Sequence, residues 1–253
     1  MYEYDDEFYR YINQGATDSA RAVIPVLLDT LPARITSVLD VGCGAGAWLR
    51  EWKSFDALVL GLDGDYVRRD RLLIDGDEFA TADLAEGFAM DRTFDLVQSL
   101  EVAEHLPPES AAGFVASLCR HGDMVLFSAA PPGQGGENHL NEQPYEYWRE
   151  LFQRQGFDMY DPVRNAVLGR PEIKPWYRYN MFLYVNTRAV PELRAALAAF
   201  RVPDGEKVAD VSPALYRLRK HLVRLLPVKA GTSLAILKKN LFGLSLRSRK
   251  SGA

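Results

Sequence analysis

Cysteine is scarce in this chain, and long apolar runs are missing. Two cysteines among 253 residues, Cys43 and Cys119, are too few for a disulfide framework, so a reducing compartment is the simplest setting. No apolar run is long enough to cross a bilayer, and residues 1–7 lack the basic and then apolar order of a secretory signal. The sequence therefore predicts a cytoplasmic protein.

Acidic residues are missing beyond Asp210, although the chain has 34 of them. Of the 30 lysines and arginines, 10 lie beyond Asp210 and 20 before it, so a basic tail follows an acidic body. An acidic body argues against nucleic acid as a partner. In the tail, leucines mix with basic residues over 213–226 and again over 234–246, which is typical of an amphipathic segment on an anionic membrane. The alternatives are a helix docked on the body and a disordered tail.

The composition is otherwise that of an ordinary globular protein, with 47% hydrophobic and 25% charged residues. Its length suffices for one sizeable α/β domain and an addition. We assign residues 1–190 to that domain, including a helical cap over 4–30, and residues 191–253 to a basic amphipathic extension.

A glycine-rich turn follows an apolar strand at 38–41 and precedes a helix. In the turn, Gly42 permits a sharp change of chain direction. Gly44 has no side chain, so a ligand can approach its backbone closely. Read literally, the glycines also satisfy the dinucleotide fingerprint of dehydrogenases. Asp40 argues against that interpretation, because a carboxylate here repels a pyrophosphate and suits a ligand with sulfonium and ammonium groups.

The order Asp-x-Gly-x-Gly-x-Gly over 40–46 resembles motif I of class I methyltransferases, which use S-adenosylmethionine (SAM). Segments 57–63, 79–84 and 94–101 resemble the next strands of that family. The resemblance implies that Asp63 binds the ribose hydroxyls and Asp83 the adenine amino group. The full set of implied cofactor contacts is Asp40, Gly42, Cys43, Gly44, Gly46, Asp63, Gly64, Asp83, Leu84 and Ser99.

The remaining elements alternate between helix and strand. Helices are expected over 109–120 and 144–155, and strands over 123–130, 157–161 and 180–186. The resemblance implies a Rossmann-like α/β fold. Its seven-stranded sheet is mostly parallel with an antiparallel last strand, and helices are added at both ends of the chain.

A cluster of metal-type ligands follows the fourth predicted strand. Glu101, Glu104 and His105 converge if a helical turn begins there, and His139 lies in a loop on the same side of the sheet. Oxygen and imidazole ligands suit Mg²⁺ or Mn²⁺, whereas the lack of cysteine disfavours zinc.

The Glu-x-x-Glu-His run with a later histidine looks like the metal site of small-RNA 2′-O-methyltransferases and is similar to ubiquinone-biosynthesis O-methyltransferases. By this resemblance, Glu101, Glu104, His105 and His139 are metal ligands. Two alternatives stay open. His139 or His105 can act as the catalytic base, and Glu101 and His105 can shape the cofactor pocket of an enzyme without metal.

Segment 132–148 joins flexible glycines to a dense set of amide and carboxylate side chains. Such groups pair with the hydroxyls of a polyhydroxylated acceptor. Gln134, His139 and Asn141 are the site candidates, and Trp148 is assigned to the core. Residues 15–186 also look like bacterial methyltransferases of polysaccharide and glycolipid biosynthesis.

The leading hypothesis is therefore a SAM-dependent O-methyltransferase that acts on a sugar, an oligosaccharide or a related hydroxylated metabolite, assisted by Mg²⁺ or Mn²⁺. The alternatives are small-RNA 2′-O-methylation, a SAM-binding scaffold without catalysis recruited to a membrane, and a dehydrogenase. Candidate partners are the acceptor, an anionic membrane surface and a second copy of the chain.

Overall fold

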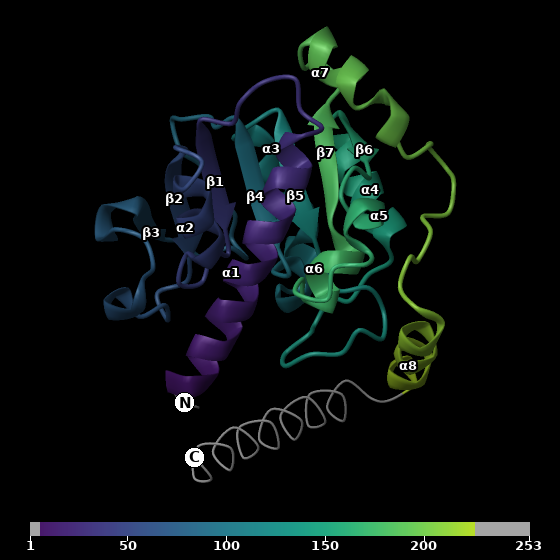
Figure 1. Ribbon diagram of the computed structural model, residues 1–253, viewed down its shortest axis with the longest axis horizontal. Helices are drawn as coiled ribbons and strands as arrows, with labels where there is room; N and C mark the ends of the chain where they lie inside the picture. Colours follow the sequence, from purple (N-terminus) through teal and green to yellow (C-terminus); the bar gives the residue numbers. More distant parts are fainter. Residues whose placement is uncertain (1–5, 226–253) are drawn as a thin grey trace.

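The computed structural model describes residues 6–225, and it contains one seven-stranded sheet with the order β3-β2-β1-β4-β5-β7-β6 (Figure 1). The strands are β1 Ser37–Val41, β2 Leu58–Asp63, β3 Phe79–Thr81, β4 Leu96–Leu100, β5 Met124–Ser128, β6 Phe157–Tyr160 and β7 Phe182–Asn186. The first five strands are parallel, and β7 runs antiparallel to both of its neighbours. This confirms the predicted fold.

Several strands are shorter than predicted, and for β3 and β4 the reason is local. β3 ends at Thr81 because the chain turns at Asp83, whose carboxylate accepts a hydrogen bond from the Ala85 N–H at 2.9 Å. β4 ends at Leu100 because Glu101 adopts a left-handed backbone conformation with φ +59°. Such a conformation costs a non-glycine residue about 1–3 kcal/mol and is typical of functional sites.

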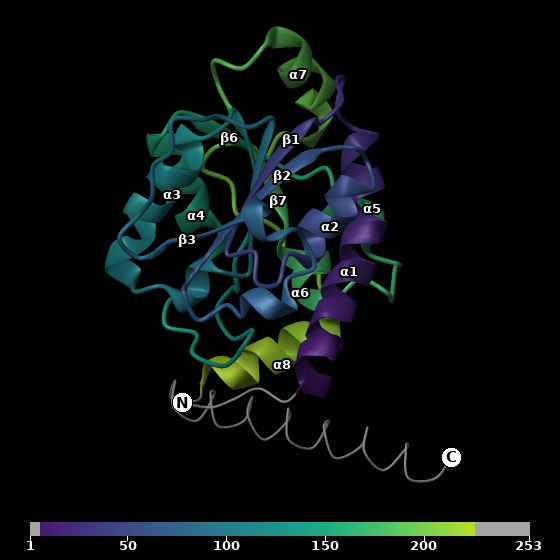
Figure 2. The ribbon, with the colours of Figure 1, turned by 90° about the vertical axis from the view of Figure 1, so that its left-hand side faces the viewer.

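Helices cover both faces of the sheet (Figure 2). On one face lie α1 and α2 with α5 and α6, and on the other lie α3 and α4. The helices are α1 Asp6–Leu28, α2 Ala47–Lys53, α3 Ala111–Arg120, α4 Tyr145–Arg154, α5 Arg164–Val167, α6 Pro175–Asn180, α7 Pro191–Ala196 and α8 Ala214–Arg224. Short 3-10 turns occupy Arg69–Arg71, Gly76–Glu78, Ala103–His105, Pro108–Ser110 and Ala198–Phe200.

The core has two parts because the central strands are buried on both faces of the sheet. β4 and β5 are buried at every position. Between the sheet and α4, Phe152 stacks on Tyr184 with ring centroids 3.8 Å apart, and Trp148 packs against Phe127. Trp148 is 1% exposed, which confirms its assignment to the core.

The predicted N-terminal helix is present and packs along α2. Arg21 holds the Glu51 carboxylate through two nitrogens at 3.1 and 3.2 Å. None of the described side chains of α1 lines the cavity that we describe below. The part of α1 whose side chains the structure describes therefore acts as a packing helix.

The segment after the sheet runs back along the molecule before α8 begins. Arg149 donates to the Pro203 carbonyl at 3.0 Å and Arg164 to the Ala209 carbonyl at 2.9 Å, so residues 201–213 are fastened to the sheet domain. α8 confirms the helix predicted over 213–226, whereas the segment 234–246 lies outside the described residues. In the described part of the chain, no helix has the length and apolarity that a membrane span requires.

Candidate active site

The glycine turn after β1 has a backbone that only glycine adopts without strain. Gly42 has φ +83° and Gly44 has φ +55°. A Cβ on Gly42 would lie 2.3 Å from the Val102 side chain, whereas a Cβ on Gly44 would meet no atom within 4 Å. Gly44 therefore presents its backbone to open space, and its N–H donates to the Asp63 carboxylate at 2.7 Å.

A cavity of about 610 Å³ opens beside this turn, where β1 to β4 end. Five of the predicted cofactor contacts line it, namely Gly42, Asp63, Gly64, Asp83 and Leu84. The lining also includes Glu101 and His105, so the cavity reaches the predicted metal cluster. Five other predicted contacts lie outside the lining and stay predictions: Asp40, Cys43, Gly44, Gly46 and Ser99.

Two of these five have side chains turned elsewhere. The Cys43 sulfur lies over Gly61, where an added Cβ would come within 2.6 Å of it, and burial raises the pKa of the thiol. The Ser99 hydroxyl is buried in β4 and has no hydrogen-bond partner among the described residues.

Asp40 lies inside the sheet between two neighbouring strands, opposite Gly61 of β2 and Gln98 of β4. It is 3% exposed, and burial raises the pKa of its carboxyl group to about 7, with a contribution from the negative charge of Asp63. The neighbouring side-chain amide of Gln98 opposes this shift. A cationic ligand nearby would favour the ionised form.

Tyr66 is a cavity residue that sequence reasoning missed. Its hydroxyl donates to Oδ1 of Asp63, and its ring lies over Gly64, where an added Cβ would come within 2.1 Å of the ring. The Gly64 N–H donates to the same carboxylate at 2.7 Å. The available signal was an aromatic residue three positions after the acid that ends β2.

Glu104, His105 and His139 form one cluster. The ligand atoms that they offer all lie within 4.8 Å of one another. Glu104 and His105 both belong to the 3-10 turn Ala103–His105. The loop after β5, which carries His139, is held against that turn because Leu140 and Asn141 both donate their N–H groups to the Glu104 carbonyl, at 2.8 and 2.9 Å. This brings together three of the four predicted ligands.

The cluster is oriented by a second layer of acceptors. His139 Nδ1 donates to Glu142 Oε1 at 2.8 Å, and His105 Nδ1 donates to the Asn138 carbonyl at 3.3 Å. Although burial favours the protonated form of Glu142, hydrogen bonds from His139 and from the Gly133 and Gly135 N–H groups hold its pKa below the usual value. An imidazole that donates through Nδ1 can offer the lone pair of Nε2 to a metal.

Glu101 is not among the ligands that lie within 4.8 Å of one another. Its carboxylate accepts hydrogen bonds from Gln134 Nε2 at 2.6 Å and from Asn180 Nδ2 at 3.3 Å. Asn180 in turn donates to the Gln134 side chain at 2.7 Å and accepts from the Tyr145 hydroxyl at 2.9 Å. The left-handed backbone of Glu101 therefore directs its carboxylate into this amide network. The predicted fourth ligand is thus separate from the other three.

A methyltransferase-domain family model matches residues 14–163. The chain belongs to the methyltransferase domain family. An O-methyltransferase of ubiquinone biosynthesis from Nitrosococcus oceani is 33% identical over 101 residues, a match that covers 36% of this chain and 42% of that protein. The chain thus spans less than half the length of this relative.

Solved structures of similar fold include sugar-modifying enzymes. A sugar N-methyltransferase from Streptoalloteichus is 18% identical with a TM-score of 0.54, over 74% of this chain and 94% of that one. An amino pentose methyltransferase from Micromonospora echinaspora, solved with SAM, is 18% identical with a TM-score of 0.53, over 74% and 99%. The chain therefore carries a methyltransferase domain, with the fold that these two solved structures share.

The cluster of this methyltransferase fits a divalent cation. Glu104 is fully buried, and neither carboxylate oxygen has a hydrogen-bond partner among the described residues. Burial raises the pKa of Glu104 well above its usual range, and the negative charge of Glu101 adds to this effect. Although His105 is an exposed residue, partial loss of hydration of its ring and the neighbouring His139 lower its pKa to about 4. A neutral imidazole and an unpartnered carboxylate are the donors that a divalent cation takes.

The predicted acceptor residues occupy the same loop. Gln134 and Asn141 are buried, and the Asn141 Nδ2 group has no hydrogen-bond partner among the described residues. Gly136 is a further residue that sequence reasoning did not single out, since a Cβ there would lie 1.9 Å from His139 Nε2. Glycine at this position keeps that nitrogen free of steric contact.

Proposed function

We propose that this methyltransferase transfers the methyl group of SAM to a hydroxyl of a sugar, an oligosaccharide or a related polyhydroxylated metabolite, with help from Mg²⁺ or Mn²⁺. The observation that carries the proposal is the unpartnered Glu104 carboxylate among two imidazoles, of which His105 lines the cavity beside the glycine turn. An alcohol needs a base or a metal to become nucleophilic.

On the cofactor side, Asp63 accepts the ribose hydroxyls in place of the Tyr66 hydroxyl and the Gly44 N–H. Asp83 and Leu84 face the adenine from the wall formed after β3. Ionised Asp40 supplies negative charge for the sulfonium and ammonium groups. The remaining contacts are backbone contacts from the turn at 42–46.

On the acceptor side, Glu104, His105 and His139 hold the cation. A bound divalent cation lowers the pKa of an adjacent hydroxyl. Glu142 keeps His139 in the tautomer that leaves Nε2 available. Glu101 orients the amides of Gln134 and Asn180, which form the wall next to the cluster.

The sugar class is supported by the polar loop that carries His139 and by the kinds of enzyme that share the fold. One solved neighbour is a sugar N-methyltransferase and another is an amino pentose methyltransferase, whereas the relative from Nitrosococcus oceani is an O-methyltransferase. Metal-type residues favour a hydroxyl over an amine, because an amine is already nucleophilic at neutral pH when it is unprotonated.

The test is incubation with methyl-labelled SAM and fractionated acceptors, in chelator and with Mg²⁺ or Mn²⁺ restored. We expect label in oligosaccharide or small polar fractions, loss of transfer in chelator, and recovery on addition of metal. Glu104→Gln should lose transfer, whereas Glu109→Gln, an exposed glutamate five residues later, should retain it. Label in RNA would replace the sugar proposal, and full activity in chelator would remove the metal.

A further inference from the structure

α8 has a row of leucines that faces away from the protein. Leu215, Leu218, Leu222 and Leu225 are 82%, 55%, 56% and 71% exposed. Their spacing of three and four residues places them on one side of the helix. An exposed apolar row of this kind marks an interaction surface in a soluble protein.

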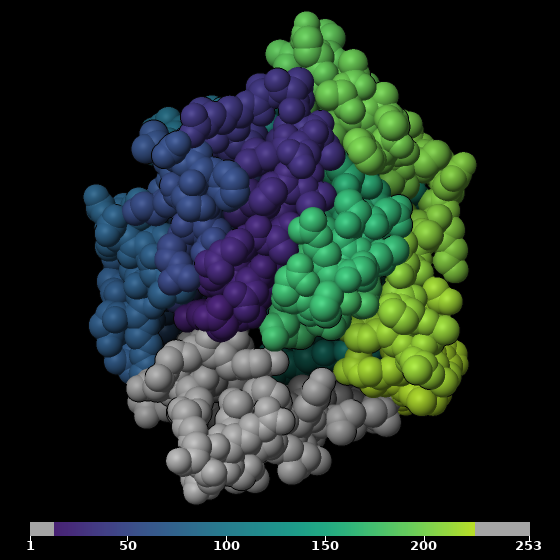
Figure 3. Space-filling model, viewed as in Figure 1, coloured from purple at the N-terminus to yellow at the C-terminus, as the bar shows by residue number. Residues whose placement is uncertain are grey.

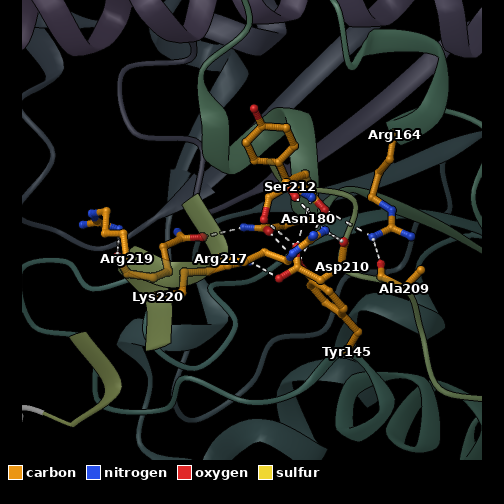
Figure 4. Close-up of polar contacts among 11 residues, drawn as sticks. Tyr145, Arg164, Asn180, Ala209, Asp210, Ser212, Arg217, Arg219 and Lys220 are labelled. Carbon is orange, nitrogen blue, oxygen red and sulfur yellow. Dashed lines mark hydrogen bonds and ion pairs between the residues drawn. The ribbon is translucent and has the colours of Figure 1, made fainter. Parts of the chain in front are cut away.

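The opposite side of α8 is fastened to the body through basic side chains (Figure 4). Lys220, which is 6% exposed, forms an ion pair with Asp210 at 2.6 Å, and Arg219 donates to the Gln134 carbonyl at 3.0 Å. Arg217 donates to the Asp210 and Ser212 carbonyls at 3.2 and 3.0 Å. An amphipathic helix on a soluble domain normally buries its apolar side, so the orientation of α8 is reversed.

α8 lies at the edge of the described molecule, where it is drawn in yellow (Figure 3). The helix packs closely on the loop after β5, since a Cβ on Gly133 would lie 2.0 Å from the Lys220 carbonyl and one on Gly135 would lie 3.0 Å from Val223. That loop carries Gln134, which bonds to Glu101 in the cavity wall. α8 and the candidate site therefore share one end of the sheet.

We propose that α8 docks on the surface of an anionic lipid bilayer through this leucine row. The positive charge of α8 and of the residues after it favours an anionic bilayer as the partner. α8 contains no acidic residue, and four of its residues, Arg217, Arg219, Lys220 and Arg224, are basic. The 28 residues after Leu225 add six lysines and arginines and no acid. Leucine with flanking positive charge is the pattern of interfacial helices on anionic lipid.

A second copy of the chain fits this surface less well. Two copies of α8 that met through their leucines would also bring together two sets of positive charge with no acid on either helix. A bilayer that carries negative headgroups offsets the same charges. Docking would place the cavity end of the sheet next to the lipid surface, which suits an acceptor that is itself held at a membrane.

The test is sedimentation of the full chain with vesicles. The probes are vesicles of equimolar phosphatidylcholine and phosphatidylglycerol, with phosphatidylcholine vesicles as the neutral comparison. The triple variant Leu215→Gln, Leu218→Gln, Leu222→Gln should partition at least about tenfold more weakly into the anionic vesicles. Leu58→Gln, at an exposed leucine at the start of β2, is the matched control and should bind like the wild type.

Binding should also weaken as salt is raised and be weak to the neutral vesicles. Thermal unfolding and SAM binding of the triple variant should match the wild type, because the three leucines are exposed. The proposal is overturned if the wild type does not sediment with anionic vesicles or if the triple variant binds as well as the control. Loss of a lipid-free dimer in the triple variant would assign the row to a second copy instead, and loss of stability would assign it to a segment of this chain.

Discussion

The Tyr66 hydroxyl donates a hydrogen bond to the Asp63 carboxylate, the group that we propose as the acceptor for the ribose hydroxyls of SAM. Tyrosine and ribose therefore compete for the same oxygen. The ring lies over Gly64 at the cavity wall, so it can leave without disturbing β2.

Tyr66→Phe should bind SAM as well as the wild type or up to about tenfold more tightly, because one competing hydrogen bond of about 1 kcal/mol is removed. Asp63→Ala should weaken binding by about tenfold or more, since it removes the acceptor itself. Isothermal titration calorimetry measures both. A clear loss of affinity in Tyr66→Phe would mean that the hydroxyl contacts the cofactor.

Glu104→Gln should make the metal-free protein more stable. Burial raises the pKa of Glu104 well above its usual range, so keeping this carboxylate ionised at neutral pH costs free energy of folding. In chelator, the melting temperature of Glu104→Gln should exceed that of the wild type. Addition of Mn²⁺ should raise the wild-type melting temperature and leave the variant unchanged. The Glu109→Gln variant should respond to Mn²⁺ like the wild type.

Glu142→Gln should weaken Mn²⁺ binding by about 10- to 100-fold, which is the usual effect of losing the acceptor behind a ligating histidine. Glu142 also accepts the Gly133 and Gly135 N–H groups, at 2.7 Å each, which a glutamine oxygen satisfies only in part. Binding of SAM should change little because the cofactor contacts lie elsewhere. An unchanged Mn²⁺ affinity, measured by electron paramagnetic resonance, would show that His139 is not a ligand.

The sequence predicted the sheet because each strand carries its own signal. The apolar run before Gly42 and the acids at 63 and 83 follow from local rules for parallel strands and turns. The orientation of Glu101 could not be predicted, because it depends on a left-handed backbone at one residue and on amides from residues 134 and 180. The same holds for α8, whose pattern predicted an amphipathic helix. Which side is buried depends on its ion pair with Asp210.

Asp40 should make both folding and SAM binding depend on pH. Its carboxyl pKa is raised from 3.8 to about 7 in the folded chain by burial and by Asp63. A raised pKa means that the folded state holds the proton more tightly, so this contribution to stability is complete below about pH 4 and is lost as the pH rises to about 7. The loss is on the order of 4 kcal/mol. In Asp40→Asn without ligand, this decline in the free energy of unfolding should disappear.

The affinity for SAM should change with pH in the opposite direction, because the sulfonium and ammonium groups favour the ionised carboxylate. The wild type should bind SAM more tightly at about pH 8 than at about pH 6, and Asp40→Asn should bind it weakly at both. S-adenosylhomocysteine, which lacks the sulfonium charge, is the control ligand and should show a smaller pH dependence in the wild type. Equal pH dependence for the two ligands would place the sulfonium away from Asp40. A pH dependence that persists in Asp40→Asn would assign the titration to another group.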